Sequence, residues 1–161
     1  MRIMTIIVRK TDGYVINSDE FNGISMADQI NILINNLDSN YYDVVEVEDP
    51  HDEVIKYLMK RYFYKNGELL CTYYITPELE EALKEAENEL ASTDYIITKA
   101  AECMALGQEL SSQYNYTEIA ERRQTLRDII NDLRQKKEDY PFTSMYITEP
   151  LIYKQSNDDK E

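Results

Sequence analysis

The clearest pattern in the chain is a run of apolar positions between residues 77 and 107. Steps of four and three residues alternate along the run, which is the spacing of a heptad seam. The seam positions are Leu79, Leu83, Ala86, Leu90, Thr93, Ile97, Ala100 and Met104. Thr76 and Pro77 suit the start of a helix and Gly107 suits its end. The spacing therefore predicts a single helix of about 30 residues.

A weak point lies in the middle of this predicted helix. Ser92, Thr93 and Asp94 are poor mid-helix residues, because their side chains compete for backbone hydrogen bonds. In an unbroken helix, Asp94 is expected to pair with Arg127 of a second helix. The alternative is a kink or break at Ser92, which would give two helices in place of one.

A second seam with the same spacing predicts another helix over residues 116–137. Asn115, followed three residues later by Glu118, has the spacing of a capping box. The seam positions are Ile119, Arg123, Leu126, Ile130 and Leu133. An apolar stripe this narrow and long needs a partner helix, so the two seams are expected to pack on each other.

Folding the two helices back about a loop near Ser112 gives an antiparallel, coiled-coil-like hairpin. Apolar positions then meet at most layers, with Met104 against Ile119, Ile97 against Leu126, Thr93 against Ile130 and Leu90 against Leu133. The same register sets Glu102 near Arg122 and Glu87 near Lys137, which would help to fix it. The alternative is that the same seam is used between subunits.

The first 75 residues show the shorter periods of a mixed α+β domain. Strands are predicted over 3–9, 14–17, 41–48, 62–64 and 69–75, with tight turns at Thr11-Asp12-Gly13 and Asn66-Gly67. A helix is predicted after a Ser25 cap, and a short one over 52–59. The fold class is therefore α+β. The predicted domains are 1–75 (α+β), 76–138 (helical hairpin) and 139–161 (extended tail).

The tail is unusually apolar for the end of a chain. Pro141 and Pro150 exclude a helix there. An extended apolar segment must pack on its own domain or on a neighbouring protein. The candidate partner-contact residues of the tail are Tyr140, Phe142, Tyr146 and Tyr153.

Charge and composition narrow the possible partners. The net charge is −14, which argues against nucleic acid and leaves open a basic protein partner or simple solubility. Fourteen tyrosines without a tryptophan favour broad protein interfaces, beside the ordinary use of tyrosine in half-buried strands. No membrane span or signal peptide is expected. Cys71 and Cys103 are expected to be reduced thiols, as in an intracellular protein.

The residues that usually carry chemistry do not form a recognisable pattern. His51 is the single histidine and lies among acids of a predicted turn, which is typical of solvated surface rather than a metal site. The loop around Asp19, Glu20, Asn22 and Asp28 lacks the ligand spacing of an EF-hand. The sequence therefore predicts a protein without catalytic activity, metal or cofactor.

A run of residues resembles a known group of proteins. It consists of Tyr64-Lys65-Asn66-Gly67-Glu68-Leu69, Leu90-Ala91-Ser92-Thr93-Asp94-Tyr95, Lys99, Glu102, Gly107, Arg122 or Arg123, Leu126-Arg127 and Ile130-Asn131-Asp132-Leu133. The run resembles the helical-hairpin segment of small tail-fibre-associated and baseplate accessory proteins of tailed bacteriophages, over about residues 62–135. The resemblance implies no activity, no cofactor and no individual site residue.

The expected function is that of a phage virion structural protein, made in the host bacterial cytoplasm and placed in the tail, baseplate or tail-fibre attachment region. Its partners would be other tail, baseplate or fibre proteins, and it would be a homo-oligomer or part of a larger assembly. One alternative is a tail-fibre assembly chaperone that is absent from the mature particle. Another is an acidic mimic of nucleic acid that inhibits a host protein.

Overall fold

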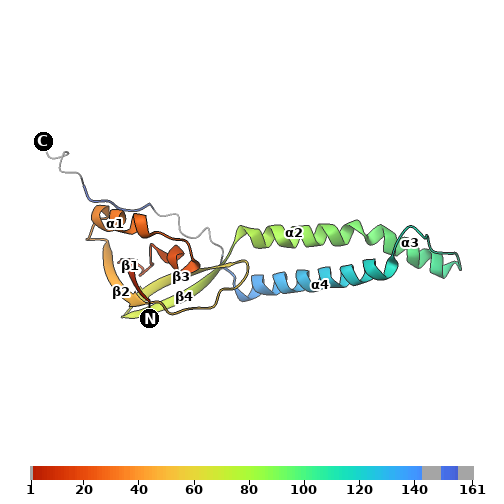
Figure 1. The fold of residues 1–161 in the computed structure, drawn as a ribbon, viewed down its shortest axis with the longest axis horizontal. Helices are drawn as coiled ribbons and strands as arrows, with labels where there is room; N and C mark the ends of the chain where they lie inside the picture. Colours follow the sequence, from red (N-terminus) through yellow and green to blue (C-terminus); the bar gives the residue numbers. More distant parts are fainter. Residues whose placement is uncertain (1, 143–149, 156–161) are drawn as a thin grey trace. The chain divides into compact units, whose positions relative to one another are not determined.

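The computed structural model describes residues 2–142 and 150–155, which form two compact units (Figure 1). The N-terminal unit contains the described residues up to Ile75, together with Phe142 and residues 150–155. The helical unit spans Thr76–Pro141. The predicted α+β class is confirmed, since small antiparallel sheets are combined with helices.

Two antiparallel strand pairs form the sheets of the N-terminal unit. Strand β1 (Ile3–Arg9) pairs with β2 (Tyr42–Glu48), and β3 (Leu58–Lys65) pairs with β4 (Glu68–Ile75). The turn between β3 and β4 is Asn66-Gly67, and both residues have positive φ, at 52° and 79°. A tight hairpin turn of this kind favours Asn-Gly, so the local sequence was sufficient to predict this hairpin.

The predicted strand over 14–17 is wrong beyond its first two residues. Isolated bridges join Val8 to Val15 and Tyr14 to Phe63, and the chain then enters the 3-10 helix η1 (Ser18–Asn22). Asn17 explains why the strand pairing ends early. At this position the side chain, in place of the backbone, forms the hydrogen bonds to backbone groups of β1. Its Oδ1 accepts from the Ile7 amide at 3.0 Å, and its Nδ2 donates to the Thr5 carbonyl at 2.8 Å.

The turn before Tyr14 brings two backbones unusually close together. Gly13 has φ +78°, and a Cβ at this position would lie 2.6 Å from the Tyr64 carbonyl oxygen. The Tyr64 amide donates to the Gly13 carbonyl at 2.7 Å. Glycine is therefore required here both for its backbone conformation and for space.

The core of the N-terminal unit lies on both faces of β1. On one face, Tyr62 of β3 is fully buried and its ring packs against Phe21. That cluster consists of Met4, Ile6, Val8, Val15, Phe21 and Tyr62. On the other face, Ile7 packs with Leu37 and Tyr42. The alternation along β1 thus feeds two apolar layers, as expected of a strand that is covered on both sides.

Two predictions about helices in this unit are corrected. Helix α1 (Ala27–Asn36) is present, but Met26 rather than Ser25 precedes it and no side-chain cap is formed. The predicted helix over 52–59 is wrong, because residues 52–57 form a loop and strand β3 begins at Leu58. Polar groups of β3 fasten the loop to the sheet. The Lys60 Nζ donates to the Asp52 carbonyl, and the Tyr62 hydroxyl donates to Asp52 Oδ2 at 2.8 Å.

From Phe142 on, the described part of the predicted tail belongs to the N-terminal unit, whereas residues 139–141 belong to the helical unit. Tyr153 bridges Leu37, and the Lys154 amide donates to the Asn36 carbonyl at 2.7 Å. Phe142 accepts from the Ile75 amide at 2.9 Å. Of the two expectations for the tail, packing on its own chain therefore explains the hydrogen bonds of these backbone groups. The Phe142 and Tyr153 side chains stay largely exposed, Tyr140 is half-buried, and Tyr146 lies outside the described residues.

Three helices make up the helical unit. They are α2 (Pro77–Ser92), α3 (Asp94–Ala105) and α4 (Tyr116–Asp139). The single helix predicted over 77–107 is wrong and the break near Ser92, its alternative, is present. The predicted cap of α4 is confirmed, since Asn115 Oδ1 accepts from the Glu118 amide at 3.1 Å. No helix within the described ranges is long and apolar enough to cross a membrane.

Helices α2 and α4 pack antiparallel in a register that differs from the predicted one. Ion pairs join Glu80 to Lys137 at 2.6 Å, Glu87 to Arg134 at 2.9 Å and Glu89 to Arg122 at 2.7 Å. The predicted pairs Glu102–Arg122 and Glu87–Lys137 are therefore wrong. The physical reason is the position of Arg123, which binds the end of α2 as described below.

Candidate protein-binding surface

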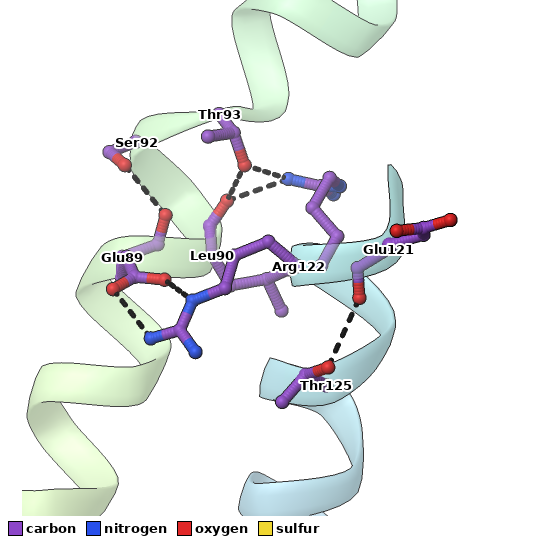
Figure 2. Close-up of polar contacts among 8 residues, drawn as sticks. Glu89, Leu90, Ser92, Thr93, Glu121, Arg122 and Thr125 are labelled. Atoms are coloured by element: carbon purple, nitrogen blue, oxygen red, sulfur yellow. Dashed lines mark hydrogen bonds and ion pairs between the residues drawn. The ribbon is translucent and has the colours of Figure 1, made fainter. Parts of the chain in front are cut away.

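A buried arginine determines where α2 ends. Arg123 of α4 is only 9% exposed. Its Nη1 donates to the Leu90 carbonyl at 2.7 Å and to Thr93 Oγ1 at 2.5 Å (Figure 2), and its Nη2 donates to Asp94 Oδ1 at 2.8 Å. The Thr93 hydroxyl itself donates to the Leu90 carbonyl at 3.0 Å. The guanidinium thus bridges the last turn of α2 and the first residue of α3.

These bonds supply what a helix end lacks. The last carbonyls of a helix have no partner within it, and a cation near them also interacts favourably with the helix dipole. Ser92 adds to the same end, since its hydroxyl donates to the Glu89 carbonyl at 2.6 Å (Figure 2). The three residues that weaken the predicted long helix are therefore the residues that build its end. Asp94 pairs with Arg123, and its predicted pairing with Arg127 is wrong.

The ion pair beside this junction is exposed but well formed. Arg122 forks onto Glu89, with its Nε and Nη2 at 2.7 and 3.0 Å from the two carboxylate oxygens (Figure 2). The hydrogen bond from Arg122 lowers the pKa of the Glu89 carboxyl, and the same bond raises the pKa of the guanidinium. Both groups are charged at neutral pH with or without this contact, and their two-pronged hydrogen bonding favours this register of α2 on α4.

The junction limits how far the apolar seam extends. Leu83 on α2 and the α4 residues Leu126, Ile130 and Leu133 are buried as predicted. Leu90, Ile97 and Ile119 are only half-buried, and Met104 is 71% exposed, so its predicted place in the seam is wrong. Helix α3 has no buried residue. The close packing of the helical unit therefore ends near Thr93, and α3 continues as a helix that its own unit covers incompletely.

The end of α3 and the segment after it expose a group of large apolar side chains. We call Met104, Leu106 and Leu110 the apolar tip. Leu106 is 70% exposed and Leu110 is 40% exposed. Tyr95, at the start of α3, is another exposed side chain. Scattered apolar residues on a surface need no explanation, whereas several that are close together in the chain form a candidate contact surface.

A shallow groove of about 300 Å³ lies beside this junction in the helical unit. Ile119 and Leu126 provide apolar lining, and the Arg122–Glu89 ion pair lines it too. The remaining lining residues are Thr93, Gln113, Tyr114, Asn115, Glu118 and Arg123. The groove is at the small end of the range for a ligand cavity, and its mixture of apolar floor and charged rim also suits a protein side chain.

A partly buried polar cluster in the N-terminal unit is formed by Asp52, Lys60, Tyr62 and Cys71. Burial and the hydrogen bond to Asp52 raise the pKa of the Tyr62 hydroxyl. Burial raises the pKa of the Cys71 thiol to about 11. A thiol with a pKa this high is a poor nucleophile at neutral pH. The cluster satisfies its own polar groups and fastens the 49–57 loop, which is a structural task.

The side chains that could bind a metal ion do not gather at one place in the described residues. Within residues 2–142 and 150–155, no three His, Cys, Asp or Glu side chains converge as metal ligands would. His51 lies at the surface with φ 53°, and its Nδ1 is 4.0 Å from Asp49 Oδ1. Cys71 and Cys103 are both free thiols.

Sequence reasoning missed two parts of this surface. It placed Arg123 at a seam position but predicted no polar contact for the side chain. A charged residue inside an apolar seam is a signal for such a contact. It also treated Met104 as a seam residue and did not single out Leu106 or Leu110. No family model, curated protein or solved structure matches the chain.

Proposed function

We propose that the chain is a non-enzymatic structural protein that acts through protein–protein contacts, with the apolar tip as a contact surface. The observation that carries this proposal is the exposure of Met104 and Leu106, at 71% and 70%, at the end of a helix that buries none of its residues. Removing such side chains from water is the main favourable term in protein association.

The charges near the apolar tip indicate the kind of partner. Glu102 and Glu109 lie within a few residues of Met104 and Leu110, and the chain as a whole carries a net charge of −14. A second copy docking tip to tip would bring like charges together. A partner with an apolar pocket and lysine or arginine residues around it would fit better, because complementary charge favours both encounter and specificity.

The likeness of residues 62–135 to phage tail-fibre-associated and baseplate accessory proteins supports a more specific role. In that role the chain is a virion component of the tail, baseplate or tail-fibre attachment region. Helices α2 to α4 serve as a long helical hairpin that presents the apolar tip to a neighbouring tail, baseplate or fibre protein. The exposed rings of Phe142 and Tyr153 provide a second contact.

The contact surface is tested by a double substitution, Met104→Gln with Leu106→Gln. We expect the wild-type protein to bind an apolar fluorescent dye. The double variant should lose roughly half of the dye signal or more, because two of its largest exposed apolar side chains are gone. Its circular dichroism should be unchanged, since neither side chain is buried.

The matched control is Ile129→Gln, which removes an exposed apolar side chain from α4, away from the tip. It should retain most of the dye signal. A wild-type protein that binds no dye would contradict the proposal. Equal losses in the control and the double variant would show that the tip has no special role.

The other candidate functions differ in observable ways. An assembly chaperone would show the same apolar tip but would be missing from finished particles. A nucleic-acid mimic needs rows of free carboxylates, whereas Glu80, Glu87, Glu89 and Asp94 of this unit are engaged by lysine or arginine. Ion pairing of this kind weakens the resemblance to a phosphate backbone.

A further inference from the structure

Strand β2 has one edge without a strand beside it in the described part of the chain. It pairs with β1 over all seven residues, from Ile3 opposite Glu48 to Arg9 opposite Tyr42, with no bulge in the register. An unpaired edge presents a row of backbone donors and acceptors that another extended chain can use. The edge is regular and long enough for such pairing, which needs only a few residues.

The edge lacks most of the devices that natural sheets use against unwanted pairing. Strand β2 contains no proline, lysine or arginine, and it is neither short nor bulged. Val44, near its middle, is 51% exposed. What the strand does carry is negative charge, on Asp43, Glu46 and Glu48.

We propose that the free edge of β2 binds an extended, basic segment of another protein by β-strand addition. The charge pattern selects the partner. Lysine or arginine opposite Asp43, Glu46 and Glu48 would form favourable cross-strand pairs, whereas a second copy of this strand would only add further carboxylates to the same edge. Val44, together with the half-buried Val45 and Val47, needs apolar residues opposite. The partner therefore alternates basic and apolar residues except for two adjacent apolar positions opposite Val44 and Val45.

The pattern can be written as a peptide. Read antiparallel to β2, from the position opposite Glu48 to the position opposite Asp43, the complementary sequence is Lys-Val-Lys-Val-Val-Lys. A fluorescently labelled peptide of this sequence is the probe, titrated into the full chain. We expect saturable binding, and we expect hydrogen exchange to show new protection of the outward-facing β2 amides. Salt should weaken the binding only in part, because backbone hydrogen bonds are not screened as exposed charges are.

Two comparisons separate strand addition from simple charge attraction. Val44→Lys places a positive charge and a flexible side chain on the edge and should weaken binding about tenfold. Val54→Lys makes the same chemical change at a residue that is 82% exposed in the 49–57 loop, and should leave the affinity within about twofold. A peptide N-methylated on the amides that face β2 keeps its charge but loses its donors, and should bind wild-type protein at least about tenfold more weakly.

Three results would overturn the proposal. The first is no binding of the peptide at all. The second is equal binding of the peptide and its N-methylated form, which would show that only charge is recognised. The third is an equal loss in Val44→Lys and Val54→Lys. Each of these leaves the role of the apolar tip untouched, because the tip belongs to the helical unit and β2 to the N-terminal unit.

Discussion

Asn17→Ala is expected to destabilise the N-terminal unit by about 2–4 kcal/mol, because it leaves two buried backbone groups of β1 without a hydrogen-bond partner. The Asn17 side chain is fully buried. It accepts from the Ile7 amide, donates to the Thr5 carbonyl, and donates to Glu20 Oε2 at 3.1 Å. Alanine offers none of these bonds, so the Ile7 amide and the Thr5 carbonyl lose their side-chain partner in a buried place.

The measurement for Asn17→Ala is chemical denaturation followed by circular dichroism, with amide exchange at Ile7 as the local readout. Asn36→Ala is the matched control, since Asn36 donates to the Ile32 carbonyl at an exposed site on α1. The control should change the free energy of unfolding by no more than about 0.5 kcal/mol. If both variants unfold at the same denaturant concentration, Asn17 does not have the bridging role that the structure gives it.

Arg123→Ala is expected to destabilise the helical unit by about 2–3 kcal/mol. The substitution removes the bonds to the Leu90 carbonyl, Thr93 and Asp94, and it leaves a gap in the interface between α2 and α4. Asp94 is largely exposed and is solvated without its partner, which keeps the loss below that of a fully buried ion pair. Arg123→Lys keeps the charge, but its single ammonium nitrogen cannot reach the three acceptors that the forked guanidinium reaches. This variant should therefore recover less than half of the lost stability.

Arg127→Ala is the control for Arg123, because it removes the same side chain one turn later on α4. Arg127 is exposed and makes one long hydrogen bond, at 3.4 Å, to Gln124. Thermal and urea unfolding of the helical signal should be nearly unchanged in this variant. The account of the junction is wrong if Arg123→Ala is as stable as Arg127→Ala, or if the lysine variant restores full stability.

The elements that could be predicted from sequence are those with a local cause. The hairpin between β3 and β4 follows from Asn66-Gly67, where a two-residue turn needs positive φ at both positions. The start of α4 follows from Asn115 and Glu118, three residues apart. Strand β1 follows from its run of β-branched residues.

The register of α2 on α4 could not be predicted, because a heptad seam looks the same after a shift of one heptad. The sequence placed Thr93 opposite Ile130, whereas the structure binds it to Arg123, seven residues earlier. Both registers bring apolar positions together, and a hydrogen-bonded arginine decides between them. The apolar tip follows from that decision, since the shift leaves Met104 without a partner helix.

The conformations of the 14–17 segment and of the 49–57 loop also depend on residues far away in the chain. Asn17 bonds to β1, ten and twelve residues away, and Asp52 is held by Tyr62 and Lys60 of β3. Local propensity favoured a strand and a helix at these places. Side-chain bonds to distant backbone replaced them, which is the usual way in which tertiary contacts override propensity.

Quantitative mass spectrometry of purified phage particles tests the proposed role most directly. Under the proposed role, the chain should be detected in purified virions as a component of the tail, baseplate or fibre attachment region. Its copy number per particle should be fixed, and the Met104→Gln, Leu106→Gln double variant should be incorporated at a much lower level. The contradicting result is a protein that is present in the infected cell but missing from normally assembled virions. That result would exclude the structural role and favour an assembly chaperone.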